Sequence, residues 1–468
     1  MFFKIIALTG FIVLDVFAGF GEAEKIYRSR SALTSKHRAL VVELVNGGHY
    51  FAAIPFMKEY LIRTNKNLDS SLEQALEKII AVAGPRQFET LPAKYLRGNK
   101  SNSLSFVLAK KALRKGKPAQ AIKRAANINP NHPVYPFAAN LLGAAFASVG
   151  KNDDSIKYFK ECQRASESMS GKTSLPAVQN QLQINRDYCE LGVARAMFGA
   201  KRYKEADLKF LDIPKTSPIW PEVLFEEAWN SYYLKNYNRT LGKLVTYKAP
   251  IFDYVFNPEI ETLRALTYLK MCLYQDAKKI SDSFYDEYLK PARRLRLYLK
   301  RNRTNYKYFY RLMLDYEKLK KSDTPLLTRL LKSVYREGSY QEVRESLIQA
   351  AKELEKTKNM PRSSFRNVLI NNLNEVVQSQ KNIMGAYVKS RLVGKYAQLY
   401  KAFEGMSYIK LEVLEQRKAR LYRYEEDQGK RGDVKYIQRN EKQYFWNFNG
   451  EFWADELGDY VFALGSEC

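Results

Sequence analysis

The three histidines of this chain, His37, His49 and His132, are the residue type best suited to metal binding and to proton transfer near neutral pH. Their positions match no metal-ligand spacing with one another or with the cysteines, so we interpret them as surface or turn residues. The sequence contains no phosphate-binding loop, dinucleotide fingerprint or nucleophile elbow. Glu226 and Glu227 are neighbours on an expected helix, where adjacent side chains point in different directions. We therefore predict a non-enzymatic protein with no cofactor and no metal ligands.

Cysteine chemistry is the second possibility. The four cysteines, Cys162, Cys189, Cys272 and Cys468, allow three disulfide pairings in an oxidising compartment. Cys162 and Cys189 fall on consecutive expected helices and could meet, but the sequence leaves the pairing open. The alternative is that the three internal thiols are small buried hydrophobic residues. Cys468 is the strongest candidate for a disulfide.

A strong positive charge makes anion binding a third kind of chemistry. The formal net charge is +27, and such a field attracts anionic partners. Residues 292–321 are rich in basic and tyrosine side chains, and this combination can hold a single-stranded nucleic acid or an anionic glycan. An amphipathic helix with tyrosines inward and bases outward has the same composition without a ligand, and we favour it. The candidate contacts to an anionic ligand are Arg293, Arg294, Arg296, Lys300, Arg301 and Arg303.

The N-terminus resembles an export signal. Lys4 precedes a mostly apolar run from Ile5 to Phe20, and small residues follow. We predict that residues 1–23 are a signal peptide cleaved after Ala23, which places the protein in the periplasm or cell envelope. Asp15 weakens the apolar run, so an uncleaved membrane anchor is the alternative. No later stretch reaches the roughly 18 apolar residues that span a bilayer.

The elements that must position these residues follow a recurring two-helix pattern between residues 34 and 291. Six small or modest residues are each followed by a second one twelve positions later, in the pairs Val41–Ala53, Ala109–Ala121, Gly143–Ser155, Ala194–Ala206, Ala228–Thr240 and Ala265–Ala277. A tyrosine lies three residues before the second position at Tyr50, Tyr203, Tyr237 and Tyr274. Small residues allow close helix crossings, and a period near 34 residues indicates stacked helical hairpins.

This spacing resembles the tetratricopeptide repeat (TPR). The unit that matches best contains Leu142, Gly143, Phe146, Gly150 and Phe159. Ala139 stands where the family has a tryptophan, and Ser155 and Thr240 replace the usual alanine. The resemblance covers somewhat over half of the chain. It implies an all-α protein, a TPR-type α-solenoid of about six to seven hairpins over residues 34–291, followed by long helices.

Composition changes after Pro291. We predict a basic helical extension over residues 292–427, including one further degenerate hairpin at 325–357. An apolar stripe within it is either a coiled-coil seam or the buried face of long packed helices. The stripe consists of Leu392, Tyr396, Leu399, Phe403, Met406 and Val413.

The last segment, residues 428–468, is an aromatic and acidic tail. Asn449–Gly450 predicts a two-residue hairpin between Trp446–Phe448 and Glu451–Trp453. We expect the tail to dock on the helices and cap the exposed end of the stack; a tail in the groove would instead be a self-inhibiting plug. Such an ending is similar to exported TPR proteins of gliding and predatory delta-proteobacteria, which implies a bacterial envelope protein.

The combined prediction is a protein–protein interaction scaffold or adaptor of the cell envelope that binds acidic partner segments in a groove. Repeat geometry places the first helix of each unit along that groove, and the candidate contacts are Tyr188, Arg195, Asn230, Tyr232 and Tyr268. The first alternative is an electrostatic binder of an anionic cell-wall polymer, surface glycan or membrane surface, with affinity that falls as salt rises. The second alternative, a nucleic-acid-binding protein, conflicts with the export signal.

Overall fold

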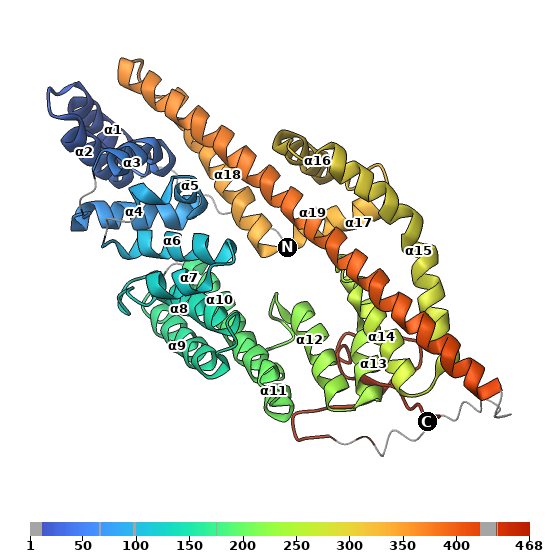
Figure 1. Ribbon diagram of the computed structural model, residues 1–468. Helices are drawn as coiled ribbons and strands as arrows, with labels where there is room; N and C mark the ends of the chain where they lie inside the picture. The colour runs from blue at the N-terminus through green and yellow to red at the C-terminus, as the bar shows by residue number, and fades with distance from the viewer. Residues whose placement is uncertain (1–11, 65–66, 97–99, 175, 422–436, 438) are drawn as a thin grey trace, which may run out of the picture. The chain divides into compact units, whose positions relative to one another are not determined.

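The protein is all-α, as the sequence predicts (Figure 1). The computed structural model describes residues 12–64, 67–96, 100–174, 176–421, 437 and 439–468. Within these residues no helix is long and apolar enough to span a membrane. The α-helices are α1 (Ile12–Arg28), α2 (Leu33–Asn46), α3 (Tyr50–Arg63), α4 (Ser70–Ala83), α5 (Arg86–Glu89), α6 (Asn102–Arg114), α7 (Pro118–Ala125), α8 (Tyr135–Ala147), α9 (Asn152–Ser170), α10 (Pro176–Gly199), α11 (Tyr203–Phe210), α12 (Trp220–Tyr233), α13 (Tyr237–Val245), α14 (Glu259–Lys270), α15 (Tyr274–Arg301), α16 (Tyr306–Leu319), α17 (Pro325–Arg336), α18 (Gly338–Lys358) and α19 (Ser364–Leu421). The remaining elements are the short 3₁₀ helices η1 (Ala93–Tyr95), η2 (Thr246–Lys248) and η3 (Pro250–Phe252) and the strands β1 (Trp446–Asn447) and β2 (Tyr460–Val461).

The chain folds into two compact units, each made from two separate segments. The first unit is Met1–Ala145 with Glu337–Tyr387, and the second is Phe146–Arg336 with Val388–Cys468. This division differs from the predicted one. The expected boundary at residue 291 falls inside α15, which continues through Pro291 because its buried face is apolar on both sides of the proline. The boundary at residue 427 lies outside the described residues.

Six pairs of consecutive helices follow the predicted spacing: α2/α3, α6/α7, α8/α9, α10/α11, α12/α13 and α14/α15. All twelve small positions of the sequence pattern are buried. The four tyrosines each begin a second helix, namely α3, α11, α13 and α15. The sequence pattern therefore locates the start of these second helices.

Each of the six turns contains one residue with a positive φ, five positions before the second small residue. These residues are Gly48, Gly116, Gly150, Lys201, Lys235 and Cys272. The next N–H donates to a carbonyl five residues back, as from His49 to Leu44 (2.7 Å) and from Arg202 to Met197 (2.9 Å). Together with the left-handed residue, this bond forms a Schellman motif, which satisfies the last carbonyls of the first helix. These turns cannot all be recognised from the sequence, because glycine occupies the left-handed position in only three of the six.

We expect that glycine at either left-handed lysine will stabilise the second unit. Lys201 and Lys235 have φ values of 61° and 63°, a conformation that costs an L-residue roughly 1–2 kcal/mol. Because glycine gains freedom in the unfolded chain, the expected net gain is about 0.5–1 kcal/mol per site. Thermal unfolding of Lys201→Gly and Lys235→Gly measures this gain, and lower melting temperatures for both would contradict it. Lys204→Gly, in the first turn of α11, is the control that should destabilise.

One apolar core joins the N-terminal helices of the first unit to helices from much later in the chain. Leu354 of α18 and Phe365 of α19 are buried in it. The Phe365 ring lies 5.7 Å from Phe20 and 5.0 Å from Tyr27, both in α1. Ala23 is fully buried in the same helix. The predicted signal-peptide cleavage point therefore falls within a helix that packs in this core.

Glu353 of α18 caps the N-terminus of α3. Its carboxylate accepts hydrogen bonds from the N–H groups of Phe51 (3.0 Å) and Ala52 (2.8 Å). His49, the residue at the cap position of α3, makes no side-chain capping bond. A carboxylate at this place satisfies helix donors that lack partners and interacts favourably with the helix dipole. Burial nevertheless raises the pKa of Glu353 to about 7.

The predicted apolar stripe of α19 is the buried face of a packed helix, which is one of the two alternatives left open by the sequence. Phe403 contacts the ring of Phe284 in α15 at 5.1 Å. Beside the stripe, the Lys395 ammonium donates to the Ser333 hydroxyl in α17 at 2.8 Å. The stripe therefore packs within the second unit, on helices of the same chain.

The C-terminal tail packs on α13 in the second unit (Figure 1). β2 approaches α13 so closely that a Cβ atom at Gly242 would lie 1.6 Å from the carbonyl oxygen of Tyr460. The Asn238 side chain bonds the N–H and the carbonyl of Leu464, both at 3.0 Å, and the Asn238 carbonyl accepts from the N–H of Phe462 at 3.2 Å. The Cys272–Cys468 disulfide fixes the end of the tail. The tail thus covers the side of a hairpin within the series, which differs from the predicted cap at its end.

The predicted tail hairpin is wrong. Trp446 in β1 pairs in parallel with Tyr460 in β2, and not with residues 451–453. Gly450 still makes a turn, with φ of 106°. The Phe448 ring lies 5.3 Å from Tyr460 and 5.7 Å from Phe462, so aromatic packing favours the longer connection.

The two helices of the further hairpin expected at residues 325–357, α17 and α18, belong to different units. α17 belongs to the second unit, where it packs on α15 and α16. α18 belongs to the first unit, where it packs on α3 and α4. Leu331 on α17 and Tyr340 on α18 are both fully buried.

Candidate partner-binding site

A pocket of about 330 Å³ lies where α10, α11 and α12 meet in the second unit. It is lined by Arg195 and Phe198 of α10, Phe210 of α11, and Glu226, Trp229 and Tyr233 of α12. The small buried residues Ala194, Ala206 and Ala228 are on the same three helices and permit their close approach. Four of the six lining residues are aromatic, so the pocket offers an apolar volume suited to a partner's side chain.

Tyr233 belongs to a cluster of aromatic rings at the pocket. Its ring stacks on Tyr203 at 5.1 Å with an interplanar angle of 12°. It meets Phe198 edge-on at 5.4 Å and lies 6.0 Å from Trp229. Tyr233 still exposes 49% of its surface. A large aromatic side chain that is held by neighbours yet half exposed is typical of contact residues in protein interfaces.

Arg195 forms the charged side of the pocket. Its guanidinium donates to Glu226 through Nε (2.7 Å) and through a second nitrogen (2.5 Å), and it also pairs with Glu222. Burial opposes the charge of Arg195, but the two carboxylates raise its pKa above the usual value. Burial also raises the pKa of Glu226. Two carboxylates facing one guanidinium leave no local positive excess, so the pocket itself does not select acidic groups.

The five groove residues predicted from repeat geometry have different environments. Arg195 lines the pocket, and the Tyr232 ring lies 5.7 Å from that of Trp229. Burial, with neighbouring tyrosines, raises the pKa of Tyr232 to about 12. Tyr188 is exposed on α10 but is not part of the pocket lining.

Two further residues of that prediction, Asn230 and Tyr268, are buried. Asn230 is fully buried, and its amide donates to the carbonyl of Tyr203 at 3.0 Å and to Asp207 at 3.3 Å. Tyr268 is also buried. Both side chains therefore lie on the packed side of their helices, and the Asn230 amide links α12 to α11.

The four aromatic pocket residues, Phe198, Phe210, Trp229 and Tyr233, were not among the predicted contacts. A usable signal was present for three of them. Trp229 and Tyr233 are four residues apart on α12, so their side chains lie on the same helix face. Phe198 follows the small position Ala194 by the same interval.

The six predicted anion contacts, Arg293 to Arg303, are all exposed. Most tyrosines of this stretch are packed: the hydroxyl of Tyr308 donates to that of Tyr298, and Tyr316 is buried, whereas Tyr306 is 44% exposed. The favoured interpretation of the sequence, an amphipathic helix with bases outward, agrees with this arrangement.

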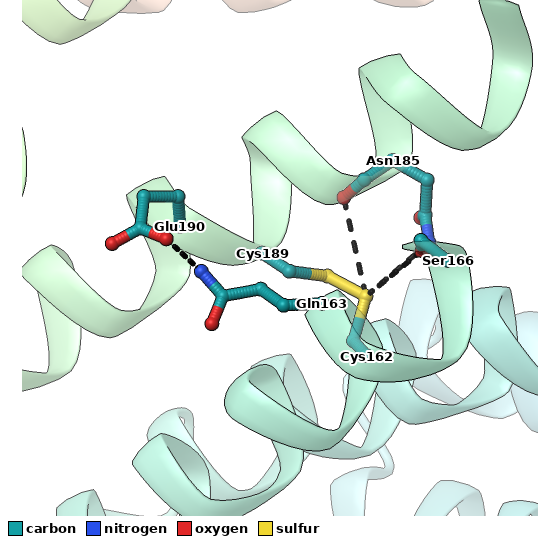
Figure 2. Close-up of a disulfide and its surroundings, with 6 residues drawn as sticks. All are labelled: Cys162, Gln163, Ser166, Asn185, Cys189 and Glu190. Carbon is teal, nitrogen blue, oxygen red and sulfur yellow. Dashed lines mark hydrogen bonds between the residues drawn. A yellow bond between two sulfur atoms is a disulfide. The ribbon is translucent and has the colours of Figure 1, made fainter. Parts of the chain in front are cut away.

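All four cysteines form disulfides, Cys162 with Cys189 and Cys272 with Cys468. Figure 2 shows the first, which links α9 to α10. The Asn185 amide next to it donates to Cys162 Sγ at 3.2 Å and to the Ser166 hydroxyl at 3.1 Å. Each disulfide fixes a connection between segments of the second unit.

His132 lies with Glu73 and Glu77 in the first unit, a group of metal-ligand type that the sequence did not reveal. Its Nε2 is 2.6 Å from Glu77, and its Nδ1 accepts the N–H of Val134 at 3.3 Å. A metal on Nε2 would require the proton on Nδ1, where it would face that N–H donor. The group therefore fits a structural hydrogen-bonded pair better than a metal site.

No protein-family model matches the sequence, and no curated protein matches it significantly.

Proposed function

We propose that this protein is a non-enzymatic scaffold of the bacterial cell envelope, in which a TPR-type α-solenoid binds segments of partner proteins. The repeat assignment is supported by the six hairpins with buried small residues and left-handed turns. The binding function rests on one observation, the aromatic pocket between α10, α11 and α12. A partner segment would insert an apolar side chain there, and the net charge of +27 would favour acidic residues elsewhere in that partner.

Two observations support an exported location. The first is the signal-like N-terminal sequence, and the second is the pair of disulfides, which persist in oxidising compartments. N-terminal sequencing of the native protein distinguishes the two proposed forms. A mature chain that begins at Glu24 supports a cleaved signal, whereas an intact N-terminus supports an anchor and retains the contact of Phe20 with Phe365.

Selection from a displayed peptide library tests the pocket. We expect the selected peptides to share an apolar anchor residue and to bind Tyr233→Ala roughly 30-fold more weakly than wild type, because truncation of a central aromatic contact costs about 2 kcal/mol. Tyr408→Ala is the matched control, since Tyr408 is a 74% exposed tyrosine of the same unit. Equal binding to both variants would contradict a role for this pocket.

A further inference from the structure

The C-terminal half of α15 has two faces of opposite character. Its buried side chains, Tyr288, Ala292, Leu295 and Leu299, recur every three or four residues and pack into the second unit. With 100° per residue, they cover an arc of roughly 60° of the helix. The outward face of α15 is several times wider than this buried arc, and its side chains are mainly basic.

The outward face is dense in positive charge. Between residues 289 and 303 the sequence contains no acidic residue and seven basic ones. They are Lys290, Arg293, Arg294, Arg296, Lys300, Arg301 and Arg303, all exposed. None of these seven forms an ion pair with another residue in the described part of the chain, whereas Arg329 on α17 pairs with Glu287 at 3.0 Å. Their charges are therefore available to an outside partner.

Two leucines lie within this basic face. Leu289 is 37% exposed and Leu297 is 57% exposed. On a helical wheel both fall inside the arc of about 160° that runs from Arg296 to Arg294. The leucines thus lie among basic side chains on the same face, so apolar and cationic groups are presented together, and a membrane interface can bind both.

We propose that this face of α15 docks on an anionic phospholipid surface. The guanidinium and ammonium groups bind lipid phosphates, while the two leucines enter the boundary between headgroups and acyl chains. The long basic side chains can extend their charged ends toward the phosphates while their methylene stems lie beside the leucines. This site is separate from the aromatic pocket and goes beyond the proposed scaffold function.

The two exposed leucines favour a lipid surface over the other anionic partners. A soluble polyanion, such as a glycan or a nucleic acid, needs only the charges and gains nothing from exposed leucines. A bilayer uses both groups at once. A lipid surface therefore explains the complete composition of the face.

Binding of the full-length protein to vesicles tests the proposal. One set of vesicles contains phosphatidylcholine with phosphatidylglycerol, and the other contains phosphatidylcholine alone; soluble dextran sulfate is the polyanion probe. The basic-face variant replaces Arg293, Arg294, Arg296 and Lys300 by glutamine. The leucine variant combines Leu289→Ala with Leu297→Ala. Both changes keep good helix formers on an exposed face, and circular dichroism verifies that the helices remain.

The wild-type protein should prefer vesicles that contain phosphatidylglycerol. The basic-face variant, which lacks four basic residues, should lose roughly 600-fold in affinity for them, since each basic residue near an anionic surface contributes about fivefold. The leucine variant should lose roughly tenfold on vesicles and bind dextran sulfate like wild type. A control with Lys151, Lys201, Lys204 and Lys235 replaced by glutamine removes the same charge from other exposed positions of the second unit, and it should keep the preference.

Two results would overturn the proposal. If the leucine variant binds the anionic vesicles as wild type does, the face is a polyanion site and not a lipid-docking site. If the basic-face variant and the lysine control lose the same affinity, net charge alone accounts for binding and α15 has no special role.

Discussion

Gly242→Ala should detach the C-terminal tail from α13. The new Cβ atom would lie 1.6 Å from the carbonyl oxygen of Tyr460, and that oxygen belongs to backbone that cannot move aside locally. Tyr460 and Val461 are each 1% exposed at this contact. Removing them from their packing should cost roughly 3–5 kcal/mol. Alanine is a better helix former than glycine, so the same substitution would stabilise an isolated helix.

Hydrogen exchange over residues 458–464 measures this loss. In Gly242→Ala the amides of Phe462 and Leu464, which are bonded to Asn238 in the native protein, should exchange at nearly unprotected rates. The Cys272–Cys468 disulfide still tethers the tail, so the helices themselves should remain protected. Gly394→Ala is the matched control, because a Cβ atom there meets no atom within 4 Å. Unchanged protection of the tail in Gly242→Ala would refute the close approach.

The second large effect concerns Glu353 and pH. The folded-state pKa of about 7 lies above the ordinary value of 4.5. The protonated form is therefore favoured in the folded protein, and its contribution to stability is complete below pH 4.5 and is lost as pH rises through 7. The loss should reach about 3 kcal/mol, since each unit of pKa shift corresponds to roughly 1.4 kcal/mol.

Hydrogen exchange of the α3 amides, measured in increasing denaturant, gives the unfolding free energy of the first unit. Repeating it between pH 4 and pH 8 checks this dependence. The unfolding free energy of wild type relative to Glu353→Gln should decrease across that range, because glutamine cannot ionise. Glu345→Gln on the same helix is the control for the loss of one carboxylate, since Glu345 is exposed. A wild-type advantage over Glu353→Gln that grows with pH would show that the capping carboxylate is charged throughout.

The hairpin part of the fold was accessible from sequence because its information is local. The small residues twelve positions apart and the tyrosines at the start of second helices are determined within each hairpin. The segments on which residues 337–387 pack could not be predicted from the sequence. Glu353 contacts Phe51 across 302 positions, and no local periodicity records such a pairing. The predicted strand pairing of the tail was wrong for a similar reason. Asn449–Gly450 is a valid turn signal, but the packing of Phe448 on Phe462 determines the partner strand.

The candidate site was only partly accessible. Repeat geometry identified Arg195 and the neighbourhood of Tyr232, since it specifies which helices face the same way. It included Asn230 and Tyr268 because it does not resolve which side of a first helix is packed. The same geometry says nothing of the glutamates that neutralise Arg195, so the predicted preference for acidic groups does not apply inside the pocket.

Site-specific photo-crosslinking in cells that produce the protein tests the central claim most directly. A benzophenone amino acid at position 233 would place the reactive group at the exposed edge of the pocket, and the same residue at position 408 would place it on an exposed part of α19. The proposed function predicts a defined crosslinked partner at position 233 that is absent at position 408 and is lost when Trp229 in the pocket is replaced by alanine. The same crosslinks at both positions, or none at position 233, would contradict a scaffold that binds partners through this pocket.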